Sequence, residues 1–554
     1  MLTLARCAAA AWLILSASSP ARSAPQDEAD RSGRGWSMVH LDLDVLPDPP
    51  NERMDLAGVM RLRLDLDQSF GPSLGVNKSK TVMTFVEVES AGATVELNAL
   101  FALSPPTRFA HVRYAEPKRC GDEVEVKFRC ASTGRAYQFV VDPGFACASW
   151  VEAWYPVPMP KTLTGYGRAT VSAPGRTRFA LPENWTAVSG GRRIEEGPGR
   201  VVWESSVPLA RSFAAGPFTE TASTSEGREI GVYLLTPKPY AAKDQARSLA
   251  AAIRAMEERF GPFPYAAYAI AEVPEQLIEW WAASEQGFIM AASTAFDVAG
   301  GNLPVFAHEA GHAWWGNQVT SAGPGGMLCS ESLAQYGVVI AIEALEGVDA
   351  ATEFLRFSRA GYHWQQCARG YFEMWREGTD KEMSKLSGQG ADHTLSDSKG
   401  HWVFHMLRDR VGDAAFFGVL RGVVEDRALE NLPLAELRRR FIAAAPEANL
   451  ERFFAQWLDR LGAPVLEEQW TDASDASGHR VRLTIAQEGE PYDLDLEVEV
   501  TGADGATTHK VAVREAVGEW VLTSPGTPRE VKLDPRHRLL IWKPEYGEKP
   551  ARAE

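Results

Sequence analysis

The sequence has no excess of basic residues, no long apolar run after its N-terminal segment, no internal repeat and no compositional bias towards disorder. Acidic residues outnumber basic ones by 73 to 57, and the formal net charge of −16 argues against nucleic acid or an anionic membrane as a partner. No later segment reaches the roughly 18 uninterrupted apolar residues of a membrane span, so stable membrane insertion is not expected. A hydrophobic content of 45% and a charged content of 23% are those of an ordinary globular protein.

The first 24 residues have the pattern of a secretory signal peptide. Arg6 supplies a short positive start, residues 8–15 form an apolar run too short to cross a bilayer, and Ala-Arg-Ser-Ala at 21–24 offers small residues for cleavage. The pattern predicts a secreted or periplasmic protein. The alternative is an N-terminal membrane anchor that stays uncleaved.

The cysteines that follow the signal segment are odd in number, so at least one thiol must stay free. Export implies an oxidising compartment, in which disulfides form. Cys120 and Cys130 flank the alternating segment 123–128, which favours a local disulfide, and Cys329 could pair with Cys367. Sequence alone does not settle the connectivity.

A chain of 554 residues is too long for one core, so we expect about three or four domains. Segments such as 38–45 and 60–66 alternate at period two between turn-rich stretches, which predicts a β-sandwich-like domain over 36–225. A mainly helical catalytic domain is expected over 226–465 and a small β-sandwich over 466–545. The fold class predicted is therefore multidomain α+β, after a signal peptide at 1–24.

Helical periodicity marks the middle region. The expected helices cover 243–260, 303–318, 331–346, 350–360, 399–411, 413–423, 434–443 and 449–461.

The segment 308–312, His-Glu-Ala-Gly-His, carries the strongest chemical signal in the chain. Two histidines four residues apart lie on one face of a helix, so both imidazoles can reach one metal ion. Glu309 sits about 100° further round the helix, where its carboxylate can act as general base on a metal-bound water without binding the metal. Pro304 suits the first turn of this helix.

Glu331 follows His312 after eighteen residues and supplies a candidate third ligand. Two histidines and a glutamate, with a fourth position left for water, form a known catalytic zinc set. The sequence therefore predicts one Zn²⁺ per chain, held by His308, His312 and Glu331. The alternative for these histidines is a purely structural pair. His401 and His405 also stand four apart, but without an intervening glutamate or a carboxylate partner, so we expect them to be structural.

These motifs resemble a family of zinc aminopeptidases of the gluzincin type, which includes membrane alanyl aminopeptidase and leukotriene hydrolase. Its members pair H-E-x-x-H with a later glutamate and carry a G-A-M-E-N exopeptidase motif. The resemblance covers most of the mature chain: Trp-Tyr-Pro at 154–156, the segment 257–265, the segment 308–319 and the segment 453–458. It implies a thermolysin-like catalytic domain behind a β-sandwich-like N-terminal domain, with peptides as substrates.

The resemblance also implies roles for individual residues and shows two departures. Where the family has G-A-M-E-N, this chain reads Ala-Ala-Ser-Glu-Gln at 282–286, so Glu285 is the candidate for binding the α-amino group of the substrate. Where the family has the tyrosine of Y-x-K-G, whose hydroxyl donates to the oxyanion, this chain has Asp397. An ionised aspartate cannot donate, and losing such a donor typically costs about 10²–10³ in rate. His393, Ser396 or Ser398 could substitute.

Three functions are compatible with this pattern. The first is an exported zinc aminopeptidase with Glu309 as general base and His393 as a further catalytic candidate. The second, suggested by Asp397, is a zinc-binding pseudoenzyme or peptide-binding protein. The third is a zinc endopeptidase or a hydrolase of non-peptide substrates. Substrate side-chain preference and oligomeric state do not follow from the sequence.

Overall fold

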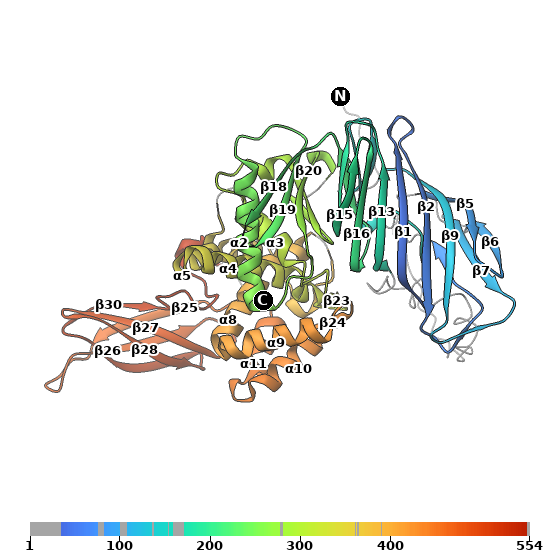
Figure 1. The fold of residues 1–554 in the computed structure, drawn as a ribbon. Helices are drawn as coiled ribbons and strands as arrows, with labels where there is room; N and C mark the ends of the chain where they lie inside the picture. The colour runs from blue at the N-terminus through green and yellow to red at the C-terminus, as the bar shows by residue number, and fades with distance from the viewer. Residues whose placement is uncertain are drawn as a thin grey trace, which may run out of the picture.

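The computed structural model describes residues 35–75, 82–99, 108–135, 138–152, 154–158, 171–225, 227–277, 281–359, 362, 365–388 and 390–550. The predicted signal peptide at 1–24 lies outside these residues. Figure 1 shows a β-rich N-terminal part, a central part in which helices gather beside a sheet, and a C-terminal part of strands. The predicted α+β fold class is confirmed.

The N-terminal part is built on a seven-stranded sheet in the order β15-β16-β13-β1-β2-β9-β5. Side chains alternate along it as predicted: in β9 every second residue from Val124 to Cys130 is buried and those between are exposed. The strands are β1 (Trp36–Asp48), β2 (Arg53–Leu64), β5 (Val82–Glu89), β9 (Glu123–Thr133), β13 (Ala173–Ala180), β15 (Arg192–Gly197) and β16 (Arg200–Leu209).

Two four-stranded sheets and a short strand pair complete this part. One sheet contains β10 (Phe139–Asp142), β11 (Phe145–Ala148), β17 (Phe213–Gly216) and β14 (Thr186–Ser189). The other contains β12 (Val157–Pro158), β4 (Ser73–Gly75), β7 (Arg108–Tyr114) and β6 (Ala93–Ala99). The pair is β3 (Gln68–Ser69) with β8 (Lys118–Arg119).

The expected disulfides are absent from the described residues: Cys120, Cys130, Cys147, Cys329 and Cys367 are all thiols outside any disulfide. Cys120 is exposed before β9, whereas Cys130 lies seven residues into that strand and faces the core. At about 3.3 Å per residue, the extended strand carries Cys130 well beyond the roughly 7 Å Cα separation that a disulfide tolerates. Cys329 and Cys367 are both buried as separate thiols.

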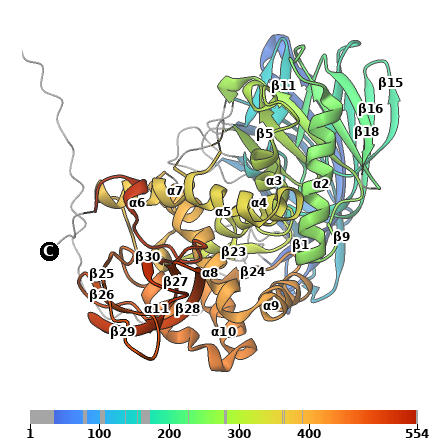
Figure 2. The same ribbon diagram turned by 90° about the vertical axis from the view of Figure 1, so that its left-hand side faces the viewer.

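The central part has a five-stranded mixed sheet in the order β18-β19-β20-β22-β21. Its strands are β18 (Thr219–Ser225), β19 (Arg228–Leu234), β20 (Tyr268–Val273), β21 (Ala282–Glu285) and β22 (Phe288–Ala292). The hairpin β18–β19 spans the predicted boundary between residues 225 and 226. Helix α2 (Ala242–Phe260) contacts β18 and β19 and also packs on α3 and α4, as Figures 1 and 2 show.

Helices α3 (Leu303–Gly311) and α4 (Glu331–Glu346) carry the predicted ligands and cross closely. A Cβ on Gly311 would lie 2.9 Å from the carbonyl oxygen of Ala334, so glycine inside the motif allows the two backbones to approach. Helix α3 ends at Gly311, seven residues before the predicted end at 318. The window Gly326–Glu346 is long and apolar enough to span a membrane, but 72% of it is buried inside the protein, as in a core helix.

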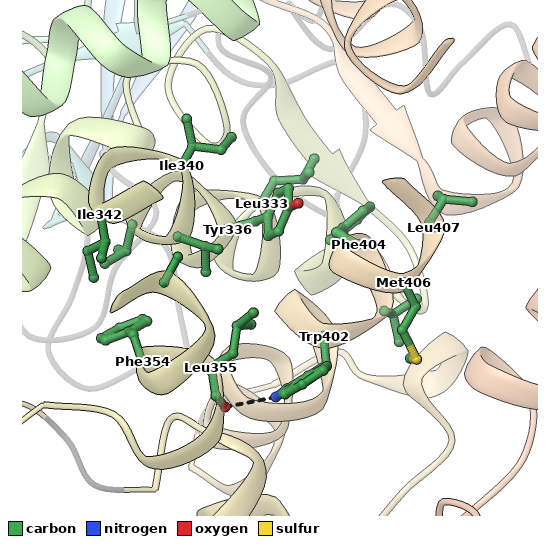
Figure 3. Packing of buried hydrophobic residues seen from close by; sticks show 14 of the residues in the cluster. Leu333, Tyr336, Ile340, Ile342, Phe354, Leu355, Trp402, Phe404, Met406 and Leu407 are labelled. Atoms are coloured by element: carbon green, nitrogen blue, oxygen red, sulfur yellow. Dashed lines mark hydrogen bonds between the residues drawn. The ribbon is translucent and has the colours of Figure 1, made fainter. Parts of the chain in front are cut away.

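Seven further helices follow α4 among the described residues. They are α5 (Val348–Phe357), α6 (Ala368–Arg376), α7 (Ala391–Leu395), α8 (His401–Val411), α9 (Asp413–Asp426), α10 (Leu434–Ala444) and α11 (Leu450–Leu458). Two of them, α5 and α8, contact α4 directly. Neither α6 nor α7 was among the expected helices. Figure 3 shows buried side chains such as Leu333 and Tyr336 of α4 beside Phe404 of α8, and Trp402 donating a 2.8 Å hydrogen bond to the carbonyl of Leu355.

The C-terminal part contains two three-stranded antiparallel sheets. The first is β25 (Leu466–Asp472), β26 (Arg480–Gln487) and β29 (Val517–Thr523). The second is β28 (Gly505–Val513), β27 (Leu494–Gly502) and β30 (Pro528–Leu533). Their buried residues belong to the same apolar cluster as the central helices.

Candidate metal centre and active site

His308 on α3 and His312, the residue that caps the C-terminal end of this helix, each present one ring nitrogen to a common point. Nδ1 of His308 lies 2.8 Å from Oε1 of Gln335, and Nδ1 of His312 lies 2.8 Å from the carbonyl oxygen of Trp315. Both partners are acceptors, so each Nδ1 carries the hydrogen and each Nε2 keeps its lone pair. The two Nε2 atoms stand 3.1 Å apart. This is the tautomer that metal binding requires.

Glu331 opens α4 and completes the set. Its Oε2 lies 3.3 Å from Nε2 of His312 and 3.6 Å from Nε2 of His308. With zinc–ligand bonds of about 2.0–2.2 Å in a tetrahedron, neighbouring ligand atoms stand about 3.4 Å apart. The three atoms therefore fit a zinc ion without rearrangement, and they form one of the candidate metal groups among the described residues.

The charges around His308, His312 and Glu331, which together are called the metal cradle below, favour binding of a cation. Burial alone would lower the pKa of His308, but its hydrogen bond to Glu331 and the charges of Asp397 and Glu309 raise that pKa to about 10. Burial opposes ionisation of Glu331, yet the neighbouring histidines hold its pKa well below the usual value. The pocket thus concentrates negative potential where the ring nitrogens meet, which stabilises a bound divalent ion.

Glu309 is buried beside the ligands and is 8% exposed. Burial raises the pKa of its carboxyl, while His308 and His312 pull it down. The pKa of Glu309 is raised overall, which makes its carboxylate a stronger proton acceptor than a fully solvated one.

Glu285 lies at the end of β21 and is 1% exposed. Its Oε2 accepts a 2.5 Å hydrogen bond from the hydroxyl of Ser212, which in turn accepts one of 2.9 Å from the backbone N–H of Trp150. After burial, the charges of Glu309 and Glu285 are among the causes that raise the pKa of the Tyr268 phenol. Strand β21, which ends at Glu285, packs against α3, and Asn317 donates a 3.2 Å hydrogen bond to the hydroxyl of Ser284, the residue before Glu285.

The opposite side of the cradle contains His393 and Asp397. His393 belongs to α7, and its Nε2 lies 3.4 Å from Oε2 of Glu331 while its Nδ1 lies 3.4 Å from Oδ2 of Asp397. The alternatives Ser396 and Ser398 turn their hydroxyls to the carbonyls of His393 and Thr394. Only His393 of the three reaches the metal ligands. Burial opposes its charge, but Asp397 and Glu331 raise the pKa of His393 to about 9.

Residues 289–457 match the Peptidase family M1 domain. The chain carries a peptidase M1 domain. This confirms the resemblance to zinc aminopeptidases, makes the domain that of a zinc metallopeptidase and agrees with the His-His-Glu group as a Zn²⁺ site. No curated protein matches the sequence significantly.

Two solved structures share the fold of this chain. Aminopeptidase A of Legionella pneumophila, solved with aspartic acid, is 15% identical with a TM-score of 0.63 over 93% of this chain. This chain spans only 60% of that protein's length. An M1 zinc metallopeptidase of Deinococcus radiodurans, solved as a point mutant, is 17% identical with a TM-score of 0.56, over 77% of this chain and 94% of its own.

Several side chains that contact the site residues were not predicted from the sequence. Gln335 accepts hydrogen bonds from both His308 and the hydroxyl of buried Tyr362, each 2.8 Å long. Gln366 donates a 2.7 Å bond to Oδ2 of Asp397. Gln335 stands four residues after Glu331, on the same helix face, so the spacing could have revealed it. No comparable signal marks Tyr362, Gln366 or the more distant Ser212.

The second histidine pair of the M1 domain lies in an apolar setting. Burial lowers the pKa values of His401 and His405 to about 3. Among the described residues neither belongs to a candidate metal group. The structural role of this pair stays a prediction.

Proposed function

We propose that the protein is an exported zinc aminopeptidase that removes N-terminal residues from peptides. The observation that carries this proposal is the convergence of His308, His312 and Glu331 within ligand spacing, beside a buried Glu309 that does not belong to the ligand group. The M1 match supports the peptidase chemistry. The pattern of residues 1–24 supports export to the periplasm or medium, and N-terminal sequencing of the exported protein is the check.

The proposed roles follow from the positions of the side chains. A bound zinc ion supplies a polarised substrate carbonyl and a water of lowered pKa. Glu309 would accept the proton of the attacking water and pass it to the leaving amine. A carboxylate whose pKa is raised by burial and lowered by neighbouring histidines suits this role. Hydrogen bonds to Gln335 and to the carbonyl of Trp315 fix the orientation of the His308 and His312 rings. The two rings therefore need no reorientation to bind a zinc ion.

Glu285 is proposed to bind the free α-amino group of the substrate. It is buried and ionisable, and its carboxylate is held by Ser212 from the N-terminal β part. A buried carboxylate attracts a cationic group strongly, because the interaction between the two charges is screened less inside a protein than in water. This would make a free N-terminus a requirement for tight binding and would distinguish the protein from an endopeptidase.

Asp397 favours a second candidate function. It is fully buried in the place of the family tyrosine and offers no hydroxyl to an oxyanion. A zinc-binding pseudoenzyme or peptide-binding protein would show peptide affinity without turnover. The aminopeptidase is preferred because His393, which faces both Glu331 and Asp397, brings an N–H donor to the edge of the cradle.

The test compares matched pairs of peptides, one with a free and one with an acetylated N-terminus. We expect turnover of the free peptide only, a loss of kcat of about 10³–10⁴ in Glu309→Gln with zinc retained, and a KM increase of about tenfold or more in Glu285→Gln. Metal content and circular dichroism serve as controls for folding. Equal cleavage of both peptides would refute the aminopeptidase, and zinc-loaded protein that binds but never cleaves would establish the pseudoenzyme.

A further inference from the structure

A second group of side chains with metal-ligand chemistry adjoins the metal cradle. Its members are Glu331, His393 and Asp397, and one ligand atom of each lies within 4.8 Å of the other two. Nε2 of His393 is 3.4 Å from Oε2 of Glu331, and Nδ1 of His393 is 3.4 Å from Oδ2 of Asp397. Two carboxylates and one imidazole are side chains that divalent metal ions use as ligands in proteins.

The two groups of candidate metal ligands have Glu331 in common. Among the described residues, neither His393 nor Asp397 belongs to the group formed by Glu331 and the two histidines of the metal cradle. The groups therefore mark two separate points that meet at the Glu331 carboxylate, which distinguishes His393 from a fourth ligand of the first ion. Two-metal hydrolase sites hold their ions about 3.5–4 Å apart, a separation that one carboxylate can bridge.

Asp397 brings a buried carboxylate to this second group. The residue is fully buried in one turn of π-helix, Ser396–Gly400, that joins α7 to α8. Its Oδ2 accepts a 2.7 Å hydrogen bond from Nε2 of Gln366, whereas Oδ1 has no hydrogen-bond partner within the described part of the chain. Buried carboxylates are paired or coordinate a metal ion, because an uncompensated charge away from water is costly. Single π-turns are also frequent at functional sites.

We propose that Glu331, His393 and Asp397 bind a second, exchangeable divalent metal ion such as Mn²⁺, with Glu331 as the ligand that both ions share. Carboxylates favour Mg²⁺, Ca²⁺ and Mn²⁺, whereas an imidazole favours transition metals, and Mn²⁺ satisfies both preferences. The ion takes the lone pair of one His393 nitrogen in place of a proton, as at other histidine ligands. The 4.8 Å limit of this group is wider than the separations of 3.1–3.6 Å in the metal cradle, so the second ion is held more weakly than the first. Binding at this point does not require the peptide turnover proposed above.

The experiment adds Mn²⁺ to purified protein that has kept its zinc, and counts bound manganese by the loss of the free-ion electron paramagnetic resonance signal. We expect about one equivalent of bound manganese in wild type and in Ser398→Ala, the matched control, whose hydroxyl bonds only carbonyls of its own helical segment. In Asp397→Asn and His393→Ala the Kd for manganese should rise about tenfold or more with zinc content unchanged, since losing a ligand costs at least as much as losing a hydrogen-bond partner of a ligand. Circular dichroism and the unfolding temperature check folding, and Asp397→Asn keeps the volume of the buried side chain.

Zinc analysis of the same samples shows which point the manganese occupies. Zn²⁺ binds a given set of ligands more tightly than Mn²⁺, so manganese should fill the second point and leave zinc in place. Glu331→Ala should lose both metals, because Glu331 belongs to both groups. Absence of manganese binding in wild type, unchanged binding in Asp397→Asn and His393→Ala, retained manganese in Glu331→Ala, or release of zinc in proportion to bound manganese would each overturn the second site. None of these measurements depends on cleavage, so a failure to turn peptides over would reject the proposed function and leave the second site standing.

Discussion

Two histidines four residues apart occur at the end of α3 (His308 and its C-cap His312) and in α8 (His401 and His405), yet the two pairs differ in their hydrogen-bond partners and in the direction of their pKa shifts. In α3 the neighbouring carboxylates raise the pKa values of both rings and the Nε2 atoms converge at 3.1 Å. In α8 burial lowers the pKa values to about 3, and Nε2 of His401 and Nδ1 of His405 have no hydrogen-bond partner in the described residues. Spacing is the same in both, so spacing alone does not make a site.

The difference lies in what surrounds the rings. The α3 pair has an acceptor behind each Nδ1 and Glu331 in front, whereas Nδ1 of His401 donates to the backbone carbonyl of Asp397 and its ring is enclosed by the core. A metal site therefore needs orienting acceptors and a charge-compensating carboxylate as well as two imidazoles. Three experiments test this difference between the two histidine pairs, and they follow in order of decreasing expected effect.

The largest effect is expected from removing one ring of each pair. His308→Ala should reduce zinc from about one equivalent to near zero after dialysis, because two protein ligands are too few for a stable site. His405→Ala, the matched control on α8, should keep its zinc. Metal analysis of both purified variants decides the matter, and zinc loss in His405→Ala would show that the α8 pair takes part in binding.

A smaller effect is expected from the acceptor behind His308. Gln335→Leu leaves Nδ1 of His308 and the hydroxyl of Tyr362 without their common acceptor. Zinc affinity should fall about 10- to 100-fold, as is usual when such an outer partner is lost. Gln335→Glu, which retains an acceptor, should bind zinc at least as tightly as wild type. Competition with a chromophoric chelator measures both constants; equal affinities in all three proteins would contradict the role of Gln335.

The smallest effect concerns the stability of α8. Because the folded-state pKa of His401 is about 3 and the unfolded value about 6.5, the unfolded state binds the extra proton below pH 6.5, and stability is lost as the pH falls. From pH 7 to pH 5 the free energy of opening of α8 should drop about 1–2 kcal/mol more in wild type than in His401→Asn, whose amide can still donate to Asp397. Hydrogen exchange of α8 peptides measures this difference. Identical pH dependence in both proteins would show that His401 does not titrate on opening.

Helices and strands could be predicted from the sequence where the hydrophobic periodicity extends over many residues. The alternating segment 60–66 lies largely in β2 and the apolar run 331–346 is α4, because one buried face imposes a period over many residues. The helices α6 and α7 were missed. Helix α7 has only five residues, too few for a period to stand out, and it carries His393.

The candidate metal ligands and the candidate general base stood out in the sequence because they lie on one helix with the residue that follows it, and at the start of another helix. His308, Glu309, His312 and Glu331 needed only the spacing of residues along two helices. The expected disulfide between Cys120 and Cys130 was wrong for a related reason: proximity along the chain is not proximity in space once an extended strand separates the two ends.

The α+β fold class, the family resemblance and the candidate zinc ligands follow from the sequence alone, since they depend on periodicity and short-range motifs. The side chains that hold the site residues in place could be identified only in the tertiary structure. Ser212 contacts Glu285, Gln335 contacts His308, and Asp397 lies beside His393. These contacts join residues from separate elements, and whether a buried carboxylate repels an oxyanion or binds a cation depends on which atoms face it. That relation is set by packing in three dimensions and leaves no pattern along the chain.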